Sequence, residues 1–161
     1  MKTLILMRHA KSSWDFAVSD RDRPLQERGI SDAHLVASEL NHLKVKIDAS
    51  FSSPANRALH TAMIALRTID FPFSKFQIDN DLYDFSGESV VEFVKEMSDD
   101  LDTVLIFGHN HAFTEIVNTC GNYYIENVPT AGLVKLNFAV DKWSAISKGI
   151  IEKTLFPKQL K

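Results

Sequence analysis

Short apolar runs along this chain alternate with longer segments in which apolar residues recur every three or four positions. The strongest runs, at residues 3–7 and 102–108, are typical of strands buried inside a sheet. Weaker runs predict two further strands, at residues 48–53 and 75–79. The helical spacing predicts four helices, at residues 25–43, 54–69, 88–97 and 113–120.

This alternation of strands and helices predicts parallel strands joined by crossover helices. The expected fold class is α/β, a three-layer α/β/α sandwich with a mostly parallel central sheet. Residues 132–140 and 142–149 predict an antiparallel pair that closes the sheet. Ser53 and Pro54 have the residue types of a helix N-cap and a first helical position, so we expect a helix to begin there.

Composition narrows the class of protein. The 161 residues are 45% apolar and 24% charged, which suits a single domain over residues 1–161. A net charge of −3 argues against a general nucleic-acid binder. The one cysteine, Cys120, cannot form an intrachain disulfide, so a reducing compartment is allowed. No apolar run approaches the ~20 residues of a membrane span, and the N-terminal run is too short for a signal peptide. We therefore predict a cytoplasmic protein that binds neither nucleic acid nor membrane.

Cations and imidazoles follow three of the predicted strands. Arg8 and His9 follow the first strand, Arg57 comes shortly after the second, and His109 follows the fourth. In sheets of this kind ligands bind outside the carboxyl ends of the strands. We therefore expect these four side chains to meet in one pocket.

The residue types in that pocket suit a phosphoryl group. Arginine offers a planar fork of donors that matches phosphate oxygens. An imidazole between arginines is pushed toward its neutral form, and a neutral imidazole is a nucleophile. The hypothesis is that His9 attacks phosphorus while Arg8, Arg57 and His109 hold the oxygens. Water then releases inorganic phosphate, and the scheme requires no metal or cofactor because the cations are built in.

Four motifs in order resemble the histidine phosphatase superfamily, the phosphoglycerate mutase-like phosphatases. "LMRHAKSSW" is similar to the Arg-His-Gly signature, "SDRDRPLQERGISDA" to the segment that follows it, "SSPANRALHTA" to the second-arginine motif and "LIFGHNHAF" to the second-histidine motif. The ending, "VPTAGLVKL" and then "LFPKQL", resembles the small SixA-type branch, named for phosphohistidine phosphatases. The resemblance implies a phosphoglycerate mutase-like fold, with His9 as nucleophile and Arg8, Arg57 and His109 as the phosphate pocket. It also implies that Arg23 contacts phosphate or substrate.

The sequence departs from the family pattern at three places. Ala10 replaces the signature glycine, and His111 stands where the family usually has proline. Larger members carry a glutamate as general acid, for which the candidate here is Asp84, with Asp81 and Glu88 nearby. A phosphohistidine leaves as imidazole and needs a proton donor less than an ester does. This favours a phosphorylated protein, or a small substrate with an accessible phosphate group, as the partner of a monomeric enzyme.

Two other functions stay open at this point. One is an interaction module that binds phosphate but turns it over weakly, suggested by the lack of a clear general acid. The other is a metal-dependent phosphoesterase in which His109 and His111 ligate a metal. Arg23 could instead form a surface salt bridge, Asp84 could be a solvated loop acid, and His111 is expected at the rim.

Overall fold

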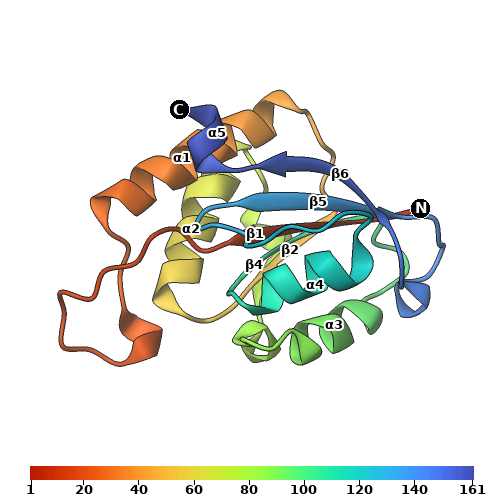
Figure 1. The fold of residues 1–161 in the computed structure, drawn as a ribbon, viewed down its shortest axis with the longest axis horizontal. Coiled ribbons are helices and arrows are strands. Elements are labelled where there is room, and N and C mark those ends of the chain that lie inside the picture. Colours follow the sequence, from red (N-terminus) through yellow and green to blue (C-terminus); the bar gives the residue numbers. More distant parts are fainter.

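The computed structural model describes all 161 residues and contains one six-stranded sheet in the order β3-β2-β4-β1-β5-β6 (Figure 1). Four neighbouring strands are parallel: β1 (Lys2–Arg8), β2 (Ala49–Ser52), β3 (Phe76–Ile78) and β4 (Thr103–Gly108). The last two strands, β5 (Leu133–Phe138) and β6 (Ile150–Leu155), are antiparallel and extend the sheet beyond β1. The prediction of a mostly parallel sheet is confirmed.

Helices cover both faces of this sheet (Figure 1). The helices are α1 (Glu27–His42), α2 (Asn56–Thr68), α3 (Glu88–Lys95), α4 (Ala112–Cys120) and α5 (Pro157–Leu160). Successive side chains of a strand point to opposite faces of the sheet, so β1 contributes side chains to the hydrophobic cores on both faces. Ile5 and Met7 pack with α1 and α2, whereas Leu4 and Leu6 pack with α3 and α4. Short 3-10 turns complete the elements: η1 (Asp20–Asp22), η2 (Phe73–Lys75), η3 (Asn80–Leu82) and η4 (Trp143–Ala145). The predicted three-layer sandwich is thereby confirmed.

The strand predicted at residues 142–149 is wrong, because the partner of β5 is β6, at residues 150–155. Trp143 lies fully buried in η4, and its indole N–H donates to the carbonyl of Leu101 at 2.7 Å. Ile146 belongs to the same core as α3 and α4. The apolar side chains of this segment therefore fill a core from a loop, and they do not alternate along a strand.

The predicted start of the second helix is also wrong by two residues. Helix α2 begins at Asn56 with Ala55 as its N-cap, and Ser53 lies outside it. The Ser53 hydroxyl accepts the N–H of Ala55 at 3.2 Å and lies 2.7 Å from a ring nitrogen of His109. Ser53 is thus committed to a tertiary contact, and the helix starts after it.

The carboxyl ends of β1, β2 and β4 lie along one edge of the sheet. Arg8 at the end of β1 pairs in register with Gly108 at the end of β4, and Ser52 of β2 pairs with Phe107. The loops that follow these strands therefore start side by side. None of the helices combines the length and the hydrophobicity needed to span a lipid bilayer.

Candidate active site

The segment after β1 is held by three other parts of the chain. The His9 N–H donates to the carbonyl of Gly108 at 3.0 Å, and the His9 carbonyl accepts the N–H of Ala131 at 3.1 Å. The Ala10 N–H donates to the Thr61 hydroxyl of α2 at 2.9 Å. Ala10 has no exposed surface, so its methyl group packs fully inside this turn. These bonds fix the backbone on which the imidazole of His9 is mounted.

The hydrogen bond of His9 defines its tautomer. Its Nδ1 lies 2.8 Å from the carbonyl oxygen of Ala10, which can only accept. Nδ1 therefore carries the hydrogen, and Nε2 keeps a free lone pair. Burial, together with the nearby positive charge of Arg57 and Arg8, lowers the pKa of His9 to about 3. At neutral pH His9 is an uncharged imidazole with its lone pair on Nε2.

His109 lies directly beside His9, with 5.3 Å between the ring centroids. It is completely buried, and its Nε2 lies 2.7 Å from the Ser53 hydroxyl. That hydroxyl also accepts the Ala55 N–H and has one hydrogen to donate. When it donates this hydrogen to Nε2, the hydrogen of a neutral His109 is on Nδ1. Burial first, and then the charge of Arg57, lowers the pKa of His109 to about 3.

Three buried nitrogen atoms of the predicted site have no hydrogen-bond partner within the protein: Nε of Arg8, Nε of Arg57 and Nδ1 of His109. Buried polar atoms without a partner are uncommon in folded proteins. Both Nε atoms carry a hydrogen, and so does Nδ1 in the tautomer described above. Three residues that the sequence assigned to a phosphate pocket thus each keep one donor that the fold does not use.

Arg57 is the second residue of α2, and only 2% of its surface is exposed. Its guanidinium donates to the carbonyl oxygen of Asp20 at 2.6 Å and to the carboxylate of Asp20 at 2.9 Å. Tyr83 donates a hydrogen bond to the same carboxylate. Desolvation acts to raise the pKa of Asp20, but the hydrogen bonds from Tyr83 and Arg57 lower it to about 2. The ionised Asp20 therefore holds two of the three nitrogens of Arg57 and leaves Nε free.

Arg23 is buried, but its contacts lie within its own loop. Its Nε donates to the carbonyl of Ser13 at 3.3 Å and its Nη1 to the Asp20 carboxylate at 3.2 Å. Its Nη2 donates to the Ser12 hydroxyl. The ring of Trp14 covers its guanidinium, with 3.3 Å between the ring centroid and Cζ. These contacts give Arg23 a role in shaping the loop, and its contact with substrate stays a prediction.

The family model for the histidine phosphatase superfamily (branch 1) matches residues 4–90, more than half of the chain. The chain belongs to the histidine phosphatase superfamily. The resemblance inferred from the four motifs is confirmed at this level. The matched part contains His9 and the two arginines of the pocket, whereas His109 lies beyond it.

Relatives of this superfamily member include curated proteins from several organisms. The uncharacterized protein Rv1276c of Mycobacterium tuberculosis is 29% identical over 153 residues, which covers 89% of this chain and 93% of that protein. The uncharacterized chloroplastic protein At3g52155 of Arabidopsis thaliana is 31% identical over 71% of this chain and 56% of its own length. The 2,3-bisphosphoglycerate-dependent phosphoglycerate mutase of Gloeothece citriformis is 42% identical, over 41% of this chain and 30% of the mutase.

Solved structures share the fold. The protein histidine phosphatase SixA, solved with tungstate, superposes with a TM-score of 0.83 at 22% identity and covers 99% of both chains. The alpha-ribazole phosphatase of Shigella flexneri superposes with a TM-score of 0.69 at 17% identity, covering 92% of this chain and 95% of that one. At these identities the likeness concerns the fold, and it confirms the predicted phosphoglycerate mutase-like architecture.

Asp84, the candidate general acid of this superfamily member, is engaged at the start of α3. One carboxylate oxygen accepts the backbone N–H and the hydroxyl of Ser86, both at 3.0 Å. The other accepts the N–H of Gly87 at 3.0 Å and that of Val90 at 3.1 Å. Both carboxylate oxygens are therefore occupied by donors of the protein, whereas a general acid must direct a proton at the leaving group. Asp84 thus anchors this loop, and its role as an acid stays a prediction that these contacts do not favour.

His111 does not join His109. It is exposed at the N-cap of α4 and lines a cavity between α3 and α4, whereas His109 is buried against His9. No group of three or more His, Cys, Asp or Glu side chains in the structure could hold a metal ion. The metal-dependent alternative, which needs further ligands beside these two histidines, has no such cluster to support it.

The sequence did not predict the roles of two residues of the site, Asp20 and Ser53. Asp20 binds Arg57 and Arg23, although the segment "SDRDRPL" drew attention only to the arginine. Ser53, expected as a helix cap, instead bonds the ring of His109 from 56 positions away. The only indication in the sequence was that each is a polar residue within one of the motifs. Their partners lie far away in the chain, so no local pattern connects them.

Proposed function

We propose that this protein is a phosphatase that hydrolyses phosphoryl groups through a covalent phosphohistidine on His9. The observation that carries the proposal is the trio of unpartnered donors on Arg8, Arg57 and His109 beside a neutral imidazole. A phosphoryl group presents oxygens that these donors can bind, and the Nε2 lone pair supplies the nucleophile. Membership of the histidine phosphatase superfamily supports phosphatase activity.

The proposed reaction has two steps. In the first, the Nε2 lone pair of His9 forms a bond to phosphorus while the bond from phosphorus to the leaving atom breaks. The leaving group departs with that electron pair and takes up a proton from solvent water. Arg8, Arg57 and the Nδ1–H of His109 donate to the phosphoryl oxygens as their charge redistributes.

In the second step water attacks the phosphorus of phospho-His9. The phosphorus–nitrogen bond breaks, its electron pair returns to Nε2, and inorganic phosphate leaves. The positive charge that the transition state needs comes from the two arginines, so the scheme is independent of metals. The water loses a proton on the way to phosphate, and a neutral His9 is regenerated for the next turnover.

The proposed substrate is a phosphohistidine on a protein, with small phosphate esters as poorer substrates. Imidazole is a better leaving group than an alkoxide, so its departure depends less on a general acid. The four hydrogen bonds to Asp84 support a site that lacks a dedicated acid. The shared fold with a protein histidine phosphatase supports the same class. We also propose that residues 1–161 form a single domain that acts as a monomer.

The deciding experiment is a rapid alkaline quench of the enzyme with a small phosphoramidate in the presence of a chelator. Peptide mass spectrometry then locates any phosphoryl group, since phosphohistidine survives alkali better than acid. We expect phosphate on His9, and a His9→Ala variant that folds but neither labels nor turns over. His60→Ala, an exposed histidine of α2, is the matched control that should keep full labelling.

Other outcomes would point to the alternatives. Turnover only after addition of a divalent metal, without a phosphoenzyme, would replace the proposal by a metal-dependent phosphoesterase. Binding of inorganic phosphate without turnover of esters or phosphoramidates would replace it by a phosphate-binding interaction module. The one observation that favours the interaction module is that hydrogen bonds from the protein occupy both carboxylate oxygens of Asp84, which leaves the site without a clear general acid.

A further inference from the structure

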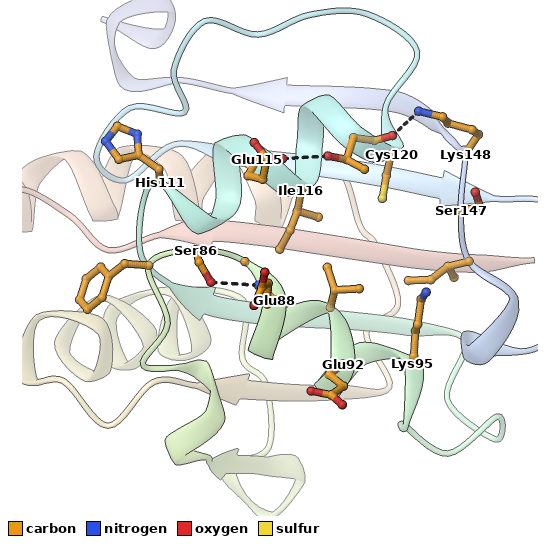
Figure 2. Close-up of a pocket in the computed structure, with 15 residues that line it drawn as sticks. Ser86, Glu88, Glu92, Lys95, His111, Glu115, Ile116, Cys120, Ser147 and Lys148 are labelled. Atoms are coloured by element: carbon orange, nitrogen blue, oxygen red, sulfur yellow. Dashed lines mark hydrogen bonds between the residues drawn. The ribbon is translucent and has the colours of Figure 1, made fainter.

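A cavity of about 700 Å³ lies between α3 and α4, on the face of the sheet that carries these helices (Figure 2). We call it the α3–α4 groove; it is lined by 15 residues, among them Phe85, Glu88, Lys95, His111, Glu115 and Lys148. Its volume lies within the range of sites that bind drug-sized ligands, well above what one phosphoryl group fills. Nothing in the proposed reaction at His9 uses it.

The groove begins at the proposed active site. Phe85 lines the groove, and its ring centroid lies 4.9 Å from that of His109. His111, two residues after His109, lines the same end (Figure 2). The Asp84 carboxylate bonds the backbone of Ser86 beside Phe85, so this junction is anchored. A molecule that reaches His9 past Phe85 therefore meets the groove next.

The charges that line the groove are unevenly distributed along it. Glu88 and Glu115 lie toward the end marked by His111, Glu92 lies further along α3, and both lysines, Lys95 and Lys148, lie at the opposite end (Figure 2). None of these five charged side chains forms an ion pair within the protein. Lys148 donates to the carbonyl of Thr119 at 2.5 Å, and Glu115 accepts from the Thr119 hydroxyl at 3.3 Å. Neither bond neutralises a charge, so all five side chains keep their charge for a bound molecule.

The space between these charges is partly apolar. Ile116 of α4 points into the groove, with Val91 of α3 and Ile146 completing the apolar lining (Figure 2). Ile116 and Ile146 are 3% and 6% exposed and form the floor of the groove, whereas the partly buried Val91 presents apolar surface. An apolar strip with a polar rim of ordered charge is the composition of protein-binding surfaces.

We propose that the α3–α4 groove docks a segment of the phosphorylated protein whose phosphohistidine enters the His9 pocket. Basic residues close to the phosphohistidine face Glu88 and Glu115, an apolar side chain covers Ile116, and acidic residues further along face Lys95 and Lys148. The inference rests on the proposed function, because it takes the phosphoprotein substrate from there. The docking proposal adds the surface that selects the substrate protein and the order of charges that this substrate must carry.

Two synthetic phosphohistidine peptides of identical composition test this order. In the first peptide, lysines flank the phosphohistidine on both sides and glutamates lie further out. In the second peptide, glutamates flank the phosphohistidine and lysines lie further out. A small phosphoramidate, which cannot reach the groove, is the reference substrate. Wild-type enzyme should show kcat/KM about fivefold higher for the first peptide, the size expected for four weak, exposed charge pairs.

In the variant Glu88→Lys/Glu115→Lys all four positions are basic, so the glutamates of either peptide are attracted alike and the preference between the peptides should disappear. The matched control, Glu27→Lys/Glu96→Lys, makes the same change in net charge at exposed positions outside the groove and should keep the wild-type preference. If the lysine variant does not fold, Glu88→Gln/Glu115→Gln should reduce the preference, because only the charge pairs with Lys95 and Lys148 remain. Equal kcat/KM for both peptides in the wild type, or the same shift in the control variant, would overturn the proposal.

The failure of docking and the failure of the proposed function give different results. If the protein is not a phosphatase, the phosphoramidate is not hydrolysed by the wild type. Binding of the two unphosphorylated peptides, followed by fluorescence anisotropy, then still tests the groove. Tighter binding of the lysine-flanked peptide that disappears in Glu88→Lys/Glu115→Lys supports docking, and equal binding of the two peptides to the wild type refutes it.

Discussion

Acidification below about pH 6.5 is expected to destabilise this fold through His9 and His109. Both are buried, and desolvation is the first cause that lowers their pKa from 6.5 to about 3. In the unfolded chain the same residues take up a proton near pH 6.5. The unfolded state thus binds more protons between about pH 6.5 and pH 3, so the free energy of unfolding falls as the pH falls through that window.

The size of the effect follows from the two pKa values. At pH 5 the unfolded form of each histidine gains about 2 kcal/mol, because pH 5 lies 1.5 units below 6.5 and each unit is worth about 1.4 kcal/mol. The folded forms gain almost nothing there, since their pKa of about 3 lies far below. Together the two histidines should remove about 4 kcal/mol, a large share of the ~5–15 kcal/mol that keeps a domain folded.

Urea denaturation at pH 8, 7, 6 and 5 measures this loss directly, from the midpoint at a constant m-value. His9→Asn removes one titrating group, so this variant should lose about 2 kcal/mol less than the wild type between pH 8 and pH 5. The matched control, His60→Asn, changes an exposed histidine of α2 and should lose as much as the wild type. Carboxyl groups that begin to titrate affect all three proteins alike and cancel in the comparison.

The reasoning would be refuted if wild type and the double variant His9→Asn/His109→Asn lost the same stability between pH 8 and pH 5. That result would mean that the fold does not hold these imidazoles neutral. The neutral nucleophile on which the proposed reaction depends would then lack its physical basis.

Three further substitutions test single contacts. Ser53→Ala removes the donor that sets the His109 tautomer, and kcat/KM should fall about tenfold, the effect of one buried hydrogen bond. Asp84→Asn should lower the free energy of unfolding in urea by about 1–2 kcal/mol and slow esters and phosphoramidates equally; greater slowing of esters would establish Asp84 as the acid. Asp20→Asn should tighten inorganic phosphate, measured as a lower inhibition constant, because a competing anion at Arg57 is lost; weaker inhibition would show that Asp20 chiefly positions Arg57.

The spacing of apolar residues was sufficient to predict a strand or helix wherever that element packs against the sheet or helix layers with regularly spaced side chains. Strands β1 and β4 are apolar because both faces are covered, and α1 has one apolar stripe because only one side meets the sheet. The pattern failed at residues 142–149, where Trp143 is buried by contacts with Leu101 and not by strand pairing. Apolar spacing reports that a side chain is buried but not which remote segment buries it.

The candidate site also has a part that the sequence predicts and a part that it does not. Arg8, His9 and His109 could be predicted together because parallel strands bring their carboxyl ends to one edge of the sheet. The links from Asp20 to Arg57 and from Ser53 to His109 could not, since these pairs are 37 and 56 positions apart and at least one partner of each lies outside the long helices and strands. No periodicity along the chain records such a contact.

The sequence by itself determined the order of the layers and the kinds of side chain at the strand ends, because hydrophobic periodicity and strand direction are local properties of the chain. The tertiary structure alone decided the charge and the tautomer of those side chains. The carbonyl of Ala10 puts the hydrogen of His9 on Nδ1, and burial keeps the ring neutral. An imidazole has the same composition in either state, and only its surroundings, assembled from distant segments, make it a nucleophile.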